Sequence, residues 1–194
     1  MLPARRFHCL DACGCYDKRG PIMKFIAGFV VALIAVACAA IIIMYTGSYN
    51  VAADVPDNPV VEWYLSNTMI HSVINRAKSV QAPAQFSDQQ ASAGFTIYSK
   101  TCVHCHGAPG RDPDDIAKGL NPDAPDLSDA ASDMTTGQMF WIIKNGIKMS
   151  GMASYAKVHN DDEIWNIVAF VQRLPKMTPE EYGRFAQNSP AKTE

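Results

Sequence analysis

The hydrophobic pattern separates one long apolar run from a series of shorter amphipathic stretches. The run from Phe25 to Tyr45 has 21 residues and no charged side chain. A run of this length crosses a bilayer as a helix, whereas the apolar part of a secretory signal has only about 7–15 residues. We therefore predict a single uncleaved membrane anchor over residues 25–45.

Basic residues in front of the anchor predict its orientation. Five Lys or Arg side chains precede it: Arg5, Arg6, Lys18, Arg19 and Lys24. The positive-inside rule then leaves residues 1–24 in the cytoplasm and exports everything after the anchor. Met23 and Lys24 directly before the apolar run are typical of the start of an exported protein, which leaves open that residues 1–22 reflect a mis-assigned start.

Alternatives to this interpretation are weaker. Val51-Ala52-Ala53 would serve a signal peptidase, but the apolar run is too long for a cleaved signal. Cys38 lies inside the run, so a small apolar side chain of a membrane helix explains it better than a lipoprotein site does. Four possible metal ligands occur near the N-terminus, and they carry too weak a signal for us to assign a role. They are His8, Cys9, Cys13 and Cys15.

Beyond the anchor, residues 46–58 are polar and predict a short connector. Pro59 then begins a helical stretch to about Val80, with apolar residues at helical spacing. This helix can lie at the bilayer surface, contact a partner subunit or pack on the domain that follows, and we expect the last. We interpret His71 within it as a surface or packing residue, because a lone histidine on a helix is rarely a ligand.

Three capping boxes mark the starts of the next long helices, with Glu or Gln three residues after a Ser, Thr or Asn. These pairs are Ser87 with Gln90, Thr135 with Gln138, and Asn160 with Glu163. The first of these helices carries Gly94 in its apolar face, and the last has apolar side chains at 3.6-residue spacing up to Pro175. A short helix from Thr178 follows. The sequence therefore predicts an all-α fold.

The net charge excludes one class of partner. Residues 46–194 carry 12 Lys or Arg and 17 Asp or Glu, a formal charge of −5. Nucleic-acid binding needs a basic surface, so we expect no nucleic-acid partner. The acidic loop between Asp112 and Asp133 lacks the spacing of an EF-hand and predicts a solvated loop with local turns.

The chemistry of the chain lies in the motif Cys102-Val103-His104-Cys105-His106. Two cysteines separated by two residues and followed at once by histidine attach a c-type haem, because each thiol adds to a vinyl group while the histidine binds the iron. A structural zinc site would need a second such cysteine pair, and the sequence has none. A thioredoxin-like pair would adjoin a strand–helix–strand pattern, whereas the flanking segments indicate helices and loops. The motif therefore predicts one covalent haem c.

The iron has a sixth position, for which the sequence offers Met149, Met152 and His159. His159 directly precedes a helix cap, where an exposed histidine is ordinary. Either methionine can reach iron from a flexible loop. Gly151 lets the backbone turn sharply before Met152, so we favour Met152 as the distal ligand and keep Met149 as the alternative.

Residues 88–175 resemble the class I cytochromes c. The resemblance rests on the order of a helix with Gly94 and Tyr98, the haem motif, Pro125-Asp126-Leu127, the methionine loop from Ile147 to Tyr155, and a last helix with Trp165 and Phe170. It implies that the two helices cross at Gly94, which then packs against Ala169 and Phe170. It also implies that the Pro125 carbonyl meets the second nitrogen of His106.

Further implications concern the methionine loop and the haem contacts. In the family an aromatic residue packs behind the methionine, and Tyr155 is the residue that matches. Leu127 and Trp141 are further expected haem contacts. The sequence departs from the family at Ala153, because a proline usually follows the methionine ligand.

The whole chain is similar to the membrane-anchored monohaem cytochromes of the bacterial inner membrane. The resemblance implies a connector over residues 46–86, a haem domain over residues 87–176 in the periplasm, and a C-terminal tail with a short helix over residues 177–194. It implies electron transfer between redox proteins of the respiratory chain, without a small-molecule substrate or catalysis.

Two other functions remain open. The chain is alternatively a fixed electron-transfer subunit of an oxidase or dehydrogenase complex, because a single anchor and one docking helix serve a bound subunit as well as a free carrier. A haem enzyme with an open sixth site is less favoured, since the sequence contains no second haem motif, no Ser-His-Asp order and no phosphate loop.

Overall fold

The computed structural model describes residues 20–188, and within them the secondary structure is helical apart from one isolated bridge between Ala108 and Arg111. This confirms the all-α fold class. The predicted N-terminal features, including Cys9, Cys13 and Cys15, lie outside the described residues. The chain divides into two compact units, residues 1–51 and residues 52–194, which are described separately.

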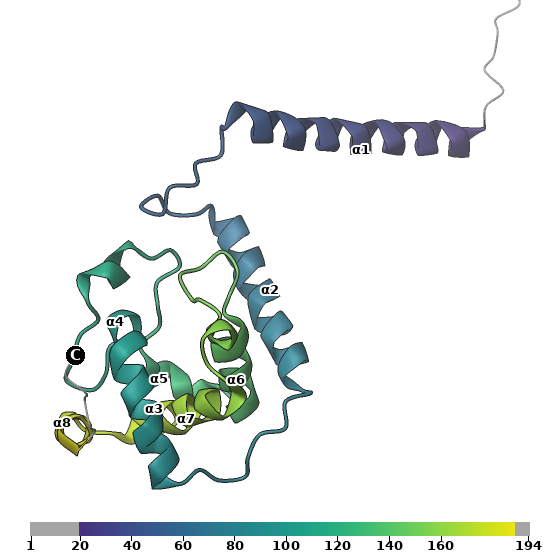
Figure 1. Cartoon of the computed structure of the whole chain (residues 1–194). Coiled ribbons are helices and arrows are strands. Elements are labelled where there is room, and N and C mark those ends of the chain that lie inside the picture. The colour runs from purple at the N-terminus through teal and green to yellow at the C-terminus, as the bar shows by residue number, and fades with distance from the viewer. Residues whose placement is uncertain (1–19, 189–194) are drawn as a thin grey trace, which may run out of the picture. The chain divides into compact units, whose positions relative to one another are not determined.

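The first unit contains helix α1, Pro21–Thr46 (Figure 1). Proline at the first helical turn and a left-handed Gly47 (φ 63°) after the last turn explain where the helix begins and ends. At 26 residues it is about 39 Å long. In the described part of the chain it is the helix that is long and apolar enough to cross a bilayer, and it fits membrane anchoring.

The second unit is built from short helices joined by loops. The α-helices are α2 (Pro59–Ala77), α3 (Asp88–Thr101), α4 (Val103–His106), α5 (Leu127–Ala130), α6 (Thr136–Asn145), α7 (Asp161–Val171) and α8 (Pro179–Asn188), and the 3-10 turns are η1 (Asp115–Gly119), η2 (Ala131–Asp133), η3 (Tyr155–Lys157) and η4 (Leu174–Lys176). The three predicted capping boxes are confirmed at the starts of α3, α6 and α7.

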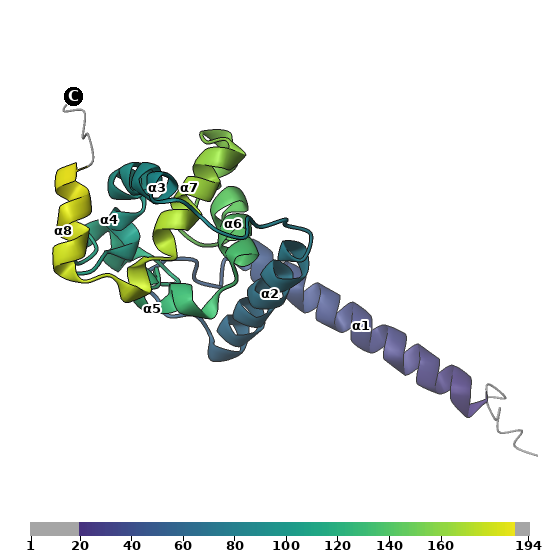
Figure 2. The same ribbon diagram turned by 90° about the horizontal axis from the view of Figure 1, so that it is seen from below.

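The contact between α3 and α7 is the centre of the fold, and Figures 1 and 2 show the two helices side by side. Gly94 lies at their crossing, but its nearest neighbours are the backbone atoms of Asn166 and Ile167. The expected packing of Gly94 on Ala169 and Phe170 is therefore wrong by about one turn. The adjacent Phe95 contacts Phe170 instead, with ring centroids 5.3 Å apart, because the larger side chain occupies the space beside the crossing.

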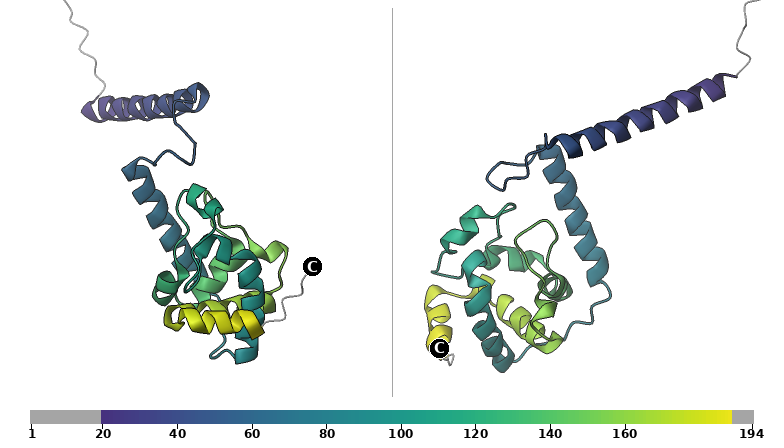
Figure 3. Two further views of the ribbon diagram at one scale, coloured as in Figure 1. Left: turned by 90° about the vertical axis from the view of Figure 1, so that its left-hand side faces the viewer. Right: turned by 45° about the horizontal axis from the view of Figure 1, so that its top comes forward.

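Helix α8, yellow in Figure 3, packs on this helix pair. Tyr182 is buried, and its ring lies 5.5 Å from that of Phe95. Phe185 lies 5.8 Å from Phe95 and 5.6 Å from Phe170. The helix expected in the C-terminal tail thus adds two aromatic side chains to the core.

Helix α2 packs on α6 through its C-terminal half, where Val73 and Ala77 are buried. Gly137 at the start of α6 permits the close approach, because a Cβ there would lie 3.3 Å from the Ala77 carbonyl oxygen. The helix packs on the following domain, as expected. His71 is exposed, which agrees with its interpretation as a surface residue.

Candidate haem-binding site

The two motif cysteines lie on one helical turn. Cys102 is the C-cap of helix α3, and its carbonyl accepts hydrogen bonds from the backbone N–H groups of Cys105 (3.1 Å) and His106 (2.9 Å). Cys102 is buried, Cys105 is half-buried, and neither forms a disulfide. Burial raises the pKa of the Cys102 thiol, an effect that hydrogen bonds from Thr101 and Tyr155 partly offset.

His106 is oriented by a backbone carbonyl. Its Nδ1 lies 2.8 Å from the carbonyl oxygen of Pro125, so Nδ1–H donates this bond and Nε2 is the nitrogen available to a metal. The contact implied by the resemblance is present. The carbonyl is held in place because Asp126, the next residue, caps α5 by accepting a 2.7 Å hydrogen bond from the Ser128 N–H.

The backbone after the motif is fixed by a buried tyrosine. The hydroxyl of Tyr98 donates a 2.7 Å hydrogen bond to the Gly107 carbonyl, and Gly107 turns the chain with φ 63°. Burial raises the pKa of Tyr98, so the phenol stays protonated and keeps donating. Tyr98 therefore joins α3 to the exit of the haem motif.

A second residue of the motif, His104, carries a contact that sequence reasoning missed. Its Nδ1 lies 2.6 Å from Asp114, and its Nε2 lies 3.1 Å from the Lys100 carbonyl. The hydrogen bond from His104 lowers the pKa of the Asp114 carboxyl. The pair ties the loop after the motif back to α3, although its two members are ten residues apart.

The methionine loop distinguishes the two candidate sulfur ligands. Met152 is half-buried and packs against the buried core, whereas Met149 is 79% exposed and has a left-handed backbone (φ 59°). The Ile147 N–H donates to the Met152 carbonyl (3.0 Å). The Ser150 hydroxyl donates to the Ile147 carbonyl (2.8 Å) and accepts from the Met152 N–H (3.2 Å).

These bonds order the loop where the family uses a proline. Gly146 contributes as well, because a Cβ there would overlap the Met152 carbonyl. The Ser154 hydroxyl donates to the Lys144 carbonyl (2.8 Å) and holds the other end of the loop. Among the Gly and Ser residues of this loop, only Gly151 supported a prediction from the sequence, and the roles of Ser150 and Ser154 were not predicted.

The other expected site residues differ in their placement. Leu127 and Tyr155 pack against the core cluster that contains Cys102. Trp141 is half-buried on α6. The third ligand candidate, His159, stacks on Tyr155 with ring centroids 5.8 Å apart and approaches Glu163 at 3.4 Å.

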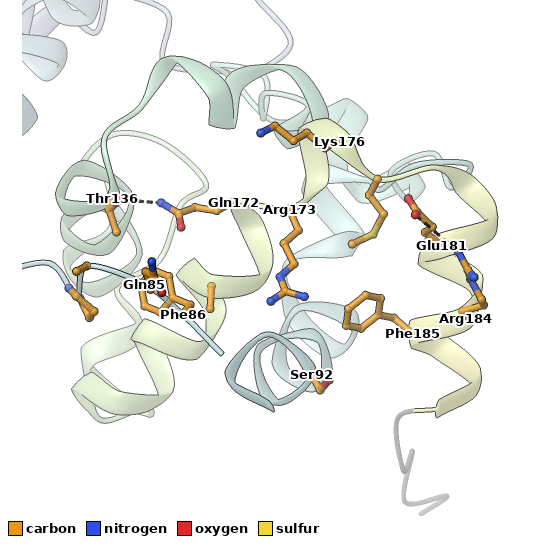
Figure 4. A pocket seen from close by; sticks show the side chains of 14 residues that line it. Gln85, Phe86, Ser92, Thr136, Gln172, Arg173, Lys176, Glu181, Arg184 and Phe185 are labelled. Atoms are coloured by element: carbon orange, nitrogen blue, oxygen red, sulfur yellow. Dashed lines mark hydrogen bonds and ion pairs between the residues drawn. The ribbon is translucent and has the colours of Figure 1, made fainter. Parts of the chain in front are cut away.

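A surface hollow of about 830 Å³ lies apart from the motif, with the side chains around it drawn in Figure 4. Residues before α3, the C-terminal end of α7 with the turn after it, and the first two turns of α8 form most of its walls. Gln172 donates a 2.7 Å hydrogen bond to Thr136 across it. None of the residues that line it belongs to the haem motif or the methionine loop.

The donor set fits a covalently attached haem. Two thiols without a disulfide lie one turn apart, and the adjacent imidazole has one nitrogen bound to a carbonyl and the other available to iron. A pair of helices that cross at a glycine, with this motif and a methionine loop between them along the chain, is the arrangement of a c-type cytochrome domain.

Comparison with known families agrees. Residues 89–171 match the family described as Cytochrome C oxidase, cbb3-type, subunit III. The match covers α3, the motif and α7, which is less than half of the chain. A comparison with curated proteins gave no match. The chain thus contains a class I cytochrome c domain, and this class carries haem c with iron and serves electron transfer.

Proposed function

We propose that this chain is a membrane-anchored monohaem cytochrome that passes single electrons between respiratory-chain proteins at the periplasmic face. Haem attached to Cys102 and Cys105 supplies a one-electron iron couple. His106 is the proximal ligand and Met152 the distal ligand. The protein binds no substrate and catalyses no reaction of its own.

The hydrogen bond from His106 to Pro125 carries this proposal. It fixes the tautomer and the ring orientation of the imidazole, so that Nε2 is the nitrogen available to iron. A packing histidine also needs a hydrogen-bond partner, but here the partner occupies Nδ1 and leaves Nε2 available beside two unpaired cysteines. Metal ligation explains both features together.

The burial of the methionine loop supports Met152 over Met149. A distal ligand must lie on the core side of its loop, and Met152 does so while Met149 is exposed to solvent. A thioether ligand stabilises the ferrous state and raises the reduction potential. A filled sixth position also argues against the enzyme with an open site.

One experiment tests the ligand assignment. In the holo-protein, Met152→Ala should abolish the weak near-infrared band between sulfur and ferric iron and lower the potential sharply. Met149→Ala is the matched control and should leave both nearly unchanged. The reverse pattern would move the ligand to Met149, and absence of the band from the wild type would point to His159 or to an open site.

The alternative function is a fixed subunit of a larger complex. It is favoured by the family description, which names a subunit of an oxidase. Purification of the tagged chain from its membranes in mild detergent separates the two possibilities. A stoichiometric oxidase or dehydrogenase in the eluate would make the chain a subunit, whereas a chain eluting alone with its haem supports the free carrier.

A further inference from the structure

Helix α2 has an apolar stripe that the second unit covers only in part, with Ile70 46% and Ile74 38% exposed. The stripe consists of Val60, Trp63, Ile70 and Ile74, which follow each other at helical spacing along one side. Val60 is 72% exposed and Trp63 is 66% exposed. Exposure is greatest in the N-terminal half of α2, because only the C-terminal half packs on α6.

Two polar side chains of this stretch are turned back on the helix. The Asn67 side chain lies within the stripe and donates a 2.8 Å hydrogen bond to the Trp63 carbonyl. The Thr68 hydroxyl donates to the Tyr64 carbonyl at 2.7 Å. These bonds satisfy one donor of each side chain on the helix's own backbone. The stripe therefore presents fewer unpaired donors to its surroundings than its composition suggests.

Chain length keeps this helix close to the bilayer. Only residues 47–58 connect α1 to α2. Twelve extended residues reach at most about 40 Å. A helix of about 39 Å spans most of the total thickness of a bilayer, which is about 40–45 Å with its headgroups, so the connector begins near the headgroup layer. The connector therefore keeps the start of α2 within about 40 Å of the headgroup layer, close enough for the helix to reach it.

The exposed side chains of α2 suit a membrane–water interface better than the surface of a charged protein. Trp63 and its exposed neighbour Tyr64 belong to the residue types that gather at membrane–water interfaces. Between Pro59 and Asn75 the single charged side chain is Glu62, which lies on another side of the helix. Insertion of apolar side chains into the lipid would then hold α2 at the membrane, and attraction to anionic lipid would not be needed.

We propose that the exposed stripe of α2 lies in the lipid interface of the membrane that holds α1. The stripe is a second membrane contact, and it restricts how far the haem domain can swing on its connector. This inference rests on the anchoring that is part of the proposed function. The two claims fail separately in the experiment that follows.

The test is photo-crosslinking of the full-length holo-protein in phosphatidylcholine liposomes. The photoreactive residue p-benzoylphenylalanine replaces Trp63 in one variant and Ile70 in another, both within the stripe. Val158, which is 73% exposed and lies outside α2, carries the same residue in the control. Mass spectrometry of the illuminated protein measures phospholipid adducts.

Lipid adducts at the two stripe positions should exceed those at Val158 several-fold. Adding phosphatidylglycerol should not increase them. Equal yields at stripe and control positions, or a cross-linked dimer in place of lipid adducts, would overturn the inference. In native membranes, cross-links from the photoreactive residue at position 63 to another protein in place of lipid would overturn the inference as well.

A carbonate wash of the same liposomes separates this inference from the anchoring. Chains that remain bound but give no lipid adduct refute the interfacial helix alone. Chains that the wash releases refute the membrane anchor, and with it this part of the proposed function.

Discussion

Gly94→Ala should destabilise the protein although alanine is the better helix former. The added Cβ would overlap the backbone carbonyl of Asn166, which cannot rotate away as a side chain could. Overpacking in a core costs about 1–3 kcal/mol, and an overlap with backbone in the central helix pair belongs at the upper end. Replacing glycine with alanine inside a helix stabilises the folded protein by about 1 kcal/mol. The net loss is about 2 kcal/mol.

The matched control is Gly183→Ala in α8, where no atom lies within 4 Å of the position of the new Cβ. This variant should be neutral or stabilised by up to about 1 kcal/mol. Thermal unfolding of the detergent-solubilised holo-protein, followed by Soret absorbance, measures both. At roughly 4 °C per kcal/mol, Gly94→Ala should lower the Tm by roughly 8 °C. If it melts with or above the wild type, as the control should, the close crossing of α3 and α7 is refuted.

Three further changes test other parts of the account. Tyr98→Phe leaves the buried Gly107 carbonyl without its donor and should cost about 1–3 kcal/mol in urea unfolding, whereas an unchanged midpoint would mean that water replaces the hydroxyl. Replacing both Cys102 and Cys105 with alanine should give an exported domain that a protease digests, because the small domain depends on haem for its core; a compact resistant domain would contradict this. Alkaline phosphatase fused after residue 50 should be active if the domain is periplasmic, and an inactive fusion would reverse the topology.

The sequence predicts features that depend on local chemistry. A capping box needs only residues three apart, so the start of α3 at Ser87 and Gln90 follows from the chain alone. The apolar run of α1 is likewise a property of composition. The haem motif is local because both thiols and the imidazole must lie on one short turn.

Features that depend on distant segments were not predictable in this way. The partner of Gly94 was placed about one turn too late, because the register of two crossing helices depends on every side chain at the contact. The hydrogen bond between His104 and Asp114 joins residues that do not lie on one helix, so no helical pattern in the sequence predicts it. The burial of Tyr182 of α8 could not be predicted, because it depends on the shape of the assembled core.

The partial burial of α2 also depends on a distant segment of the chain. Its sequence pattern predicts a packed helix and does not say which half is packed. Ala77 can pack closely because α6 has Gly137 at its second position, a residue that no periodicity along α2 can reveal.

The central claim is that this chain carries one covalent haem that exchanges single electrons. The direct measurement combines the mass of the denatured holo-protein with a redox titration of the native one. The account predicts a mass increase of one haem that survives denaturation and a titration that follows a one-electron Nernst curve. A protein that loses its haem on denaturation, carries more than one haem, or does not change its visible spectrum with potential would contradict it.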